Sequence, residues 1–85
     1  MKIKSNIAIS ESGFVFNPST GESFSVNPIG IELIHMIRSN KSFSEISREI
    51  LLNYKTDEIT FEKDYHDFIK QLEYNNVIEK EGNEA

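Results

Sequence analysis

The spacing of apolar residues changes at Asn27-Pro28, and this change limits the folds that the chain can adopt. Before it, apolar and polar residues alternate through 22–26, which is the period of a half-buried strand. After it, apolar residues recur three and four positions apart through 29–37, which is the period of a helix. Asparagine is a strong N-cap, and proline fits the first helical position. We therefore expect a strand to end and a helix to begin at this junction.

Short strands are predicted before the junction. Alternation indicates a strand near 3–9, a second at 14–17 and a third at 22–26. Gly13 and Gly21 lie in the two connections, where glycine can supply the positive φ that tight turns require. Strands joined in this way pair as an antiparallel meander.

Helices are predicted after the junction. The first runs from Pro28 to a left-handed stop at Asn40, and the second opens with Ser42 and Glu45 at the spacing of a capping box. Thr60 is the predicted N-cap of the third, which also has the clearest apolar stripe: Phe61, Tyr65, Phe68, Ile69 and Leu72. Three strands followed by three helices predict an α+β fold, with a three-stranded antiparallel sheet covered on one face by helices.

Length and composition restrict the class of protein. Eighty-five residues suffice for one domain, expected at 1–79 and followed by a polar, flexible tail at 80–85. The chain has no cysteine, which excludes thiolate metal sites, iron–sulfur clusters and thiol nucleophiles. No apolar run approaches the roughly 20 residues of a membrane span, so we expect a cytoplasmic protein that does not bind a membrane.

Residues that could carry chemistry are sparse. His35 and His66 fall on predicted polar helix faces, and no hydrolase, metalloprotease or nucleotide-binding motif occurs. Asp57, Glu58 and Glu62 could hold a metal, but acidic residues near a helix N-terminus are explained by the helix dipole. We expect no enzymatic activity, catalytic residue, cofactor or metal site.

A DNA-binding winged helix is an alternative interpretation of the last two helices. The third helix would then enter the major groove, but its outer face mixes acidic and basic residues: Glu62, Lys63, His66, Asp67, Lys70 and Glu73. The net charge of −5 also disfavours phosphate binding, so no nucleic-acid partner is expected.

The strand at 22–26 offers a different kind of surface. It carries no proline or lysine that would protect a sheet edge. An extended peptide could therefore add to it as a further strand, with backbone bonds giving affinity and neighbouring pockets giving selectivity. A general protein-interaction role fits the same feature.

The stretch FVFNPSTGESFSVNPIGIELIHMI resembles the PqqD-like family in its order of strand, turn, G-x-x-[YF]-x-[LV]-N-x-x-[GA] and apolar helix. The matching positions are Gly21, Phe24, Val26, Asn27 and Gly30. Residues 42–54 and 64–78 are similar to the second and third helices of the family, so the resemblance covers roughly 7–79. Family members commonly have glycine where this chain has Asn40 and Asn76, and asparagine is the next best residue for the left-handed conformation.

The resemblance implies a winged helix-turn-helix-like peptide chaperone. Such domains bind the leader of a ribosomally synthesised precursor peptide and present it to a modifying enzyme, often a radical SAM protein. The leader of the family lies on the third strand, which here means the backbone of Ser23, Phe24, Ser25 and Val26. Either of two flanks of the third helix could line the groove: Asp64, Phe68, Gln71 and Asn75, or Tyr65, Ile69 and Asn76. The first flank is the predicted one.

Overall fold

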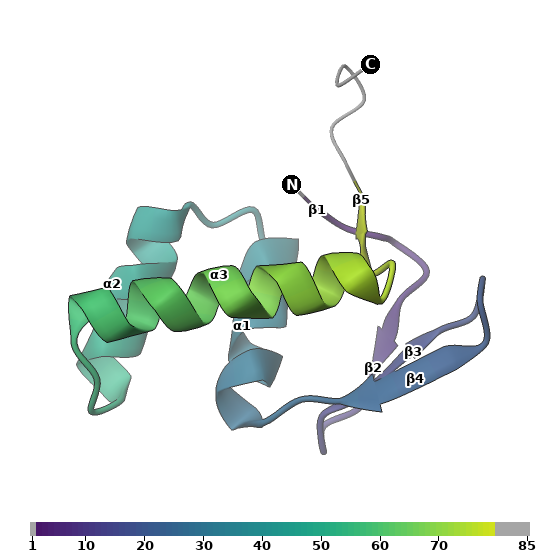
Figure 1. Cartoon of the computed structure of the whole chain (residues 1–85), viewed down its shortest axis with the longest axis horizontal. Helices are drawn as coiled ribbons and strands as arrows, with labels where there is room; N and C mark the ends of the chain where they lie inside the picture. The colour runs from purple at the N-terminus through teal and green to yellow at the C-terminus, as the bar shows by residue number, and fades with distance from the viewer. Residues whose placement is uncertain (1, 80–85) are drawn as a thin grey trace.

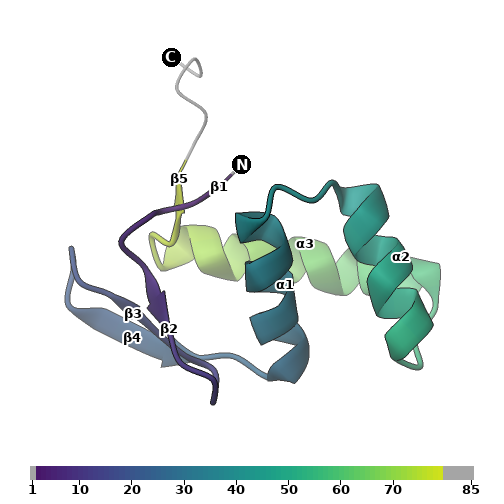
Figure 2. The same ribbon diagram turned by 180° about the vertical axis from the view of Figure 1, so that it is seen from behind.

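The computed structural model describes residues 2–79, and the predicted tail at 80–85 lies outside the described residues. The elements in chain order are β1 (Lys2–Ile3), β2 (Ala8–Ile9), β3 (Phe14–Asn17), β4 (Glu22–Ser25), α1 (Pro28–Arg38), α2 (Phe43–Asn53), α3 (Glu58–Tyr74) and β5 (Ile78–Glu79). Helix α3 runs along one side of the molecule, with the sheet of β2, β3 and β4 projecting as a wing near its C-terminal end (Figure 1). From behind, α1 and α2 lie against the other side of α3 (Figure 2).

The wing is the predicted meander. Strand β3 lies between β2 and β4, and both pairs are antiparallel. Gly13 and Gly21 have φ of 95° and 77°, which confirms the reason for glycine in the two turns. Val15 and Phe24 stand opposite each other on the face towards the helices. The α+β class and the three-stranded sheet are therefore confirmed.

The prediction of one strand near 3–9 is wrong. Strand β1 pairs with β5 in a separate two-stranded ladder, and only β2 joins the wing. The N–H of Ile7 donates to the carbonyl of Lys4 at 3.2 Å, which closes a turn between the two pieces. Ile3 ends β1 and Ile7 lies just before β2, and both are buried, so these two residues of one parity still face one core.

Local capping largely follows the prediction. The Asn27 side chain accepts from the N–H of Gly30 at 2.8 Å, and both bonds of the capping box between Ser42 and Glu45 are present. The prediction of Thr60 as N-cap of α3 is wrong. Asp57 is the cap, because its carboxylate accepts from the N–H of Thr60 at 2.7 Å, and the helix therefore starts at Glu58.

A single apolar core joins the wing to the helices. Its fully buried apolar side chains come from β3, the three helices and the residue before β5: Val15, Ile34, Ile46, Ile50, Leu72 and Val77. Because the core includes both β3 and α3, the position of the wing relative to α3 depends on this packing.

Asn17, at the end of β3, is a buried polar residue that the sequence patterns did not single out. Its side chain is 2% exposed. The Nδ2 atom donates to the carbonyl of Asn76 at 3.0 Å, and Oδ1 accepts from the N–H of Ser19 at 2.9 Å. Asn76 follows α3 in the left-handed conformation, with φ of 59°. Asn17 therefore ties the wing directly to the C-terminal end of α3.

We expect Asn17→Ala to lower the free energy of unfolding by about 1–3 kcal/mol, because it leaves the carbonyl of Asn76 and the N–H of Ser19 without their partner. Urea unfolding followed by circular dichroism would measure the loss. Asn53→Ala is the matched control, since Asn53 makes one exposed bond to the carbonyl of Glu49. Equal losses in the two variants would contradict a special role for Asn17.

Candidate functional site

The outer edge of β4 is unpaired in the described part of the chain. Within residues 2–79, β4 has β3 as its one neighbour in the sheet. The N–H of Val26 donates to the carbonyl of Gly13 at 2.8 Å, so the backbone polar groups of Val26 point towards β3. In an antiparallel pair, successive residues direct their backbone groups to opposite sides. The N–H and C=O groups of Ser23 and Ser25 consequently point outward, and both residues are exposed.

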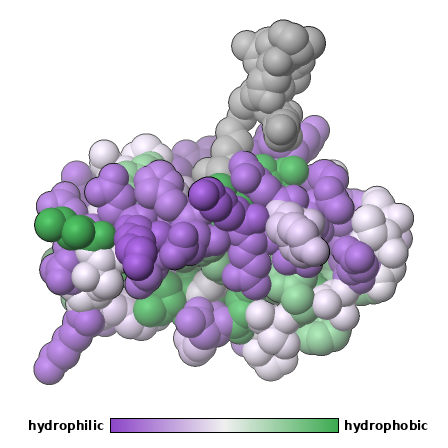
Figure 3. All heavy atoms as spheres, in the orientation of Figure 1, coloured by the Kyte–Doolittle hydropathy of each residue, from purple (hydrophilic) through white to green (hydrophobic). Residues whose placement is uncertain are grey.

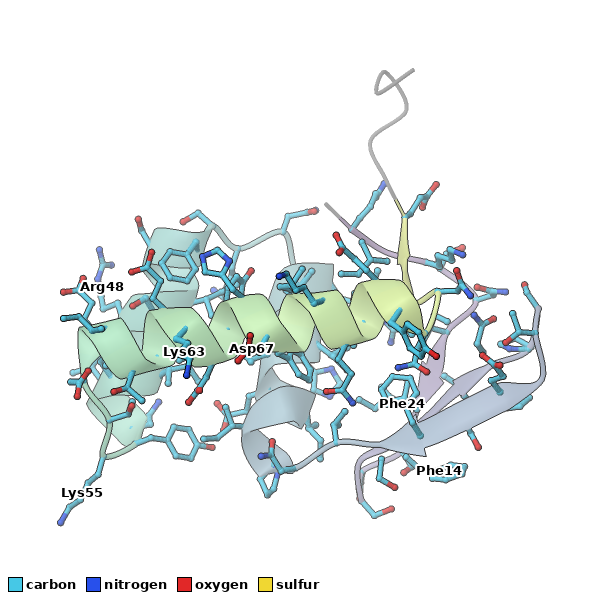
Figure 4. All side chains as sticks on the ribbon, viewed as in Figure 1. Phe14, Phe24, Arg48, Lys55, Lys63 and Asp67 are labelled. Atoms are coloured by element: carbon cyan, nitrogen blue, oxygen red, sulfur yellow. The ribbon has the colours of Figure 1, made fainter. Side chains whose placement is uncertain are left out.

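The space beside this edge is apolar. The Phe24 side chain is half-buried and lies between β4 and the C-terminal part of α3 (Figure 4). Val26 and Phe68 meet at Gly30, where an added Cβ would lie 2.9 Å from Val26 Cβ and 3.1 Å from Phe68 Cε1. Glycine at this position in α1 therefore allows α3 to approach the end of β4 closely.

A pocket of about 200 Å³ continues from this contact along α3. Its walls come mainly from α1 and α3, including Leu33, Phe61 and Phe68, and Ile50 of α2 also contributes. Its one ionisable carboxylate is that of Asp64, and no lysine or arginine lines it. Hydrophobic residues are visible below the polar outer surface of α3 (Figure 3). The pocket is suited to one apolar side chain, and it favours a neutral or cationic group over an anionic one.

The first predicted flank of α3 faces this space in part. Asp64 and Phe68 line the pocket, together with Gly30 at the start of α1. Gln71 is exposed. Asn75 is half-buried, and its Nδ2 donates to the carbonyl of Gln71 at 2.9 Å within the same helix. Phe68 therefore lies near Val26, just past the end of β4, and Asp64 shares its pocket, whereas the Asn75 amide is bonded within its own helix.

The alternative flank lies partly in the core and partly at the same pocket, because Tyr65 also lines that pocket. Tyr65 is 6% exposed and packs against the rings of Phe43 and Phe61 at centroid distances of 4.8 and 5.8 Å. Burial raises the pKa of the Tyr65 hydroxyl. Ile69 is half-buried against the core, and the carbonyl of Asn76 is already bonded to Asn17. The pocket thus takes residues from both flanks. The deeper burial of Tyr65 and the bonded Asn76 carbonyl favour the first flank as the more accessible wall.

Several pocket residues were expected only as core or connection residues. Ile29, Leu33 and Ile50 belong to apolar stripes, and Thr56 lies in a polar connection. Among these pocket residues, Gly30 is the one whose type hinted at a nearby contact. A glycine inside a helix is costly unless another group approaches its backbone.

Residues 2–79 lack a metal-binding cluster and a membrane-spanning helix. Among residues 2–79, no three His, Asp or Glu side chains are grouped as a metal site would require. His35 and His66 are exposed, as predicted. No helix in that range combines the length and apolarity needed to cross a membrane.

The fold and the open edge define a small winged-helix-like domain with a strand available for pairing. The chain belongs to the PqqD family, whose model, described as coenzyme PQQ synthesis protein D, matches residues 13–78. This match confirms the family resemblance seen in the sequence.

The fold also matches a solved structure, TbiB1 in complex with the TbiA(beta) leader peptide. The two chains are 24% identical, the TM-score is 0.83, and the match covers 98% of this chain and 100% of that chain. No curated protein matches the sequence.

Proposed function

We propose that this protein binds the leader of a ribosomally synthesised precursor peptide as an added strand on β4. The outward backbone groups of Ser23 and Ser25 are the observation that carries the proposal. Phe24 lies between β4 and α3, and the pocket lined by Phe68 begins near Val26, just past the end of this edge. Membership of the PqqD family supports it, as does the likeness to TbiB1, a protein solved with a leader peptide.

The energetic argument requires both backbone bonds and a side-chain anchor. A disordered leader loses conformational entropy when it becomes a strand, at about 1–2 kcal/mol for each ordered residue. A backbone hydrogen bond returns only about 0.5–1.5 kcal/mol net. Burial of one large apolar side chain adds about 1.5–3 kcal/mol. The pocket beside Phe68 and Asp64 therefore supplies affinity that the strand edge alone does not.

The proposed role is presentation rather than chemistry. The leader is held so that a modifying enzyme, such as a radical SAM protein, reaches the rest of the precursor. This chain has no cysteine, so thiolate-held iron–sulfur chemistry belongs to that partner. The net charge of −5 favours encounter with leader or enzyme surfaces that carry Lys or Arg. A cytoplasmic location is part of the same proposal.

A titration of the ¹⁵N-labelled protein tests this function. The ligand is a synthetic peptide with the leader sequence of a precursor encoded in the genomic neighbourhood, where such a gene is found. We expect the largest amide shifts at Ser23 and Ser25, with further shifts around Gly30 and Phe68, because these residues form the edge and the adjoining pocket.

Shifts confined to α2 or to the outer surface of α3 would argue against strand addition on β4. A double-stranded DNA ligand provides the second arm of the titration. Salt-dependent binding of that duplex, centred on α3 and without any response to the leader, would favour the DNA-binding alternative.

A further inference from the structure

The face of the wing that points away from the helices carries two exposed aromatic side chains. Phe14 is 50% exposed and Phe16 is 39% exposed, although both belong to the central strand β3. Figure 4 shows Phe14 on one side of the sheet and Phe24 on the other, towards α3. The described core does not include either ring, so their exposure is not explained by the packing of the domain.

The neighbours of these rings are small. In the register of the sheet, Phe14 stands opposite Ser25 and Phe16 stands opposite Ser23. On the other side, Phe16 stands opposite Ala8 of β2. On the β4 side, a serine side chain is therefore all that separates each ring from the free edge, and the rings are accessible from that edge.

A strand added to β4 would place side chains on both faces of the extended sheet. Adjacent strands lie about 4.8 Å apart, so the added strand would run roughly 10 Å from β3. Its side chains on the outer face would lie next to Ser23 and Ser25. A large side chain there can extend over the short serine and contact the aromatic ring behind it, because long and aromatic side chains interact beyond the nearest strand position.

We propose that the leader is recognised on both faces of its strand, with the outer-face side chains packing on Phe14 and Phe16 across Ser25 and Ser23. This inference rests on the proposed function and specifies the kind of leader peptide that binds. Strands that are covered on both faces consist of nearly continuous apolar residues rather than alternating ones. The leader segment therefore contains adjacent large apolar residues, one set facing the groove of Phe24 and Phe68 and the other facing Phe14 and Phe16.

The test compares Phe14→Ser and Phe16→Ser with Leu52→Ser. Leu52 lies on α2 and is 78% exposed, so Leu52→Ser removes a comparable exposed apolar side chain away from the wing. Binding of the fluorescently labelled synthetic leader is measured by anisotropy. We expect each phenylalanine variant to weaken binding by about 3- to 10-fold, the range of one aromatic contact, and the control to change it less than twofold.

A serine scan of the leader keeps the protein unchanged and covers the case in which a phenylalanine variant unfolds. Serine substitutions at apolar leader positions that face the groove, and at those that face the outer side of the sheet, should both weaken binding. In combination with Phe14→Ser, substitutions at outer-face positions should have smaller effects than in the wild type.

Three results would overturn the inference. If the phenylalanine variants bind the leader as tightly as the wild type while Ser23 and Ser25 still show amide shifts, only the inference fails. If those variants instead convert a dimer to a monomer in sedimentation without changing leader affinity, the face covers a second copy of this chain. If the wild type does not bind the leader, both the proposed function and the inference fail.

Discussion

Replacing Gly13 with alanine is expected to destabilise the domain by about 2–4 kcal/mol. Gly13 has φ of 95°, a conformation that L side chains rarely adopt, and an added Cβ would lie 2.3 Å from the carbonyl oxygen of Val26. That oxygen belongs to the backbone, so β4 would have to move away from β3. A domain of this size has a total stability of about 5–15 kcal/mol, and the expected loss is a large part of it.

Gly21→Ala is the matched control for Gly13→Ala, because the two glycines share a positive φ but differ in their surroundings. Gly21 has φ of 77°, and nothing lies within 4 Å of an added Cβ there. We expect this control to cost about 1 kcal/mol, which is the conformational penalty alone. Urea unfolding of both variants gives the difference. If both variants lose the same stability, the close approach of Gly13 to Val26 does not contribute to the cost of Gly13→Ala.

The successful predictions concern features that neighbouring residues decide. Asn27 caps α1 through the N–H of Gly30, only three residues away, and the box of Ser42 and Glu45 has the same short range. Asn40 adopts the positive φ expected where the first helix stops. Such features need no knowledge of the tertiary fold, because all of the bonding groups lie within one turn.

The wrong predictions arise where a segment or a helix end could take more than one partner. Ile3, Ile7 and Ile9 share one parity and suggest a single strand, but Lys4 bonds to Val77 at the other end of the chain. Pairing over this sequence distance leaves no trace in local alternation. Thr60 failed as a cap for a simpler reason: Asp57, three residues earlier, is an equally good cap and allows a longer helix.

The candidate site was only partly accessible to sequence reasoning. The apolar stripe of α3 is present, and the predicted strand at 22–26 is present over Glu22–Ser25, with Val26 bonded to Gly13 just beyond it. The choice between the flanks of α3 depends on Gly30, which brings Phe68 to α1, and on Asn17, which engages Asn76. Both contacts join segments that are distant in sequence, so periodicity could not distinguish the flanks. The predicted binding residues stay a prediction, with Asp64 and Phe68 now placed at the pocket.

Ser25→Pro is expected to weaken leader binding by about 30-fold or more while leaving the domain folded. The substitution removes an outward N–H and places a ring at the edge where the leader would pair. A leader carbonyl is then left without its partner, which costs about 1–3 kcal/mol beyond the lost bond. Proline is tolerated on an edge strand when the missing N–H faces solvent, so thermal unfolding should change little.

Two further variants decide whether an effect of Ser25→Pro comes from the edge. Ser25→Ala keeps the N–H and should bind the leader within about twofold of the wild type, since only the hydroxyl is removed. Phe24→Pro removes an N–H on the side that pairs with β3, so it should unfold the wing instead of acting selectively on binding. Undiminished leader affinity in a folded Ser25→Pro protein would show that the leader does not pair with β4. Its binding surface would then have to be sought on the helices.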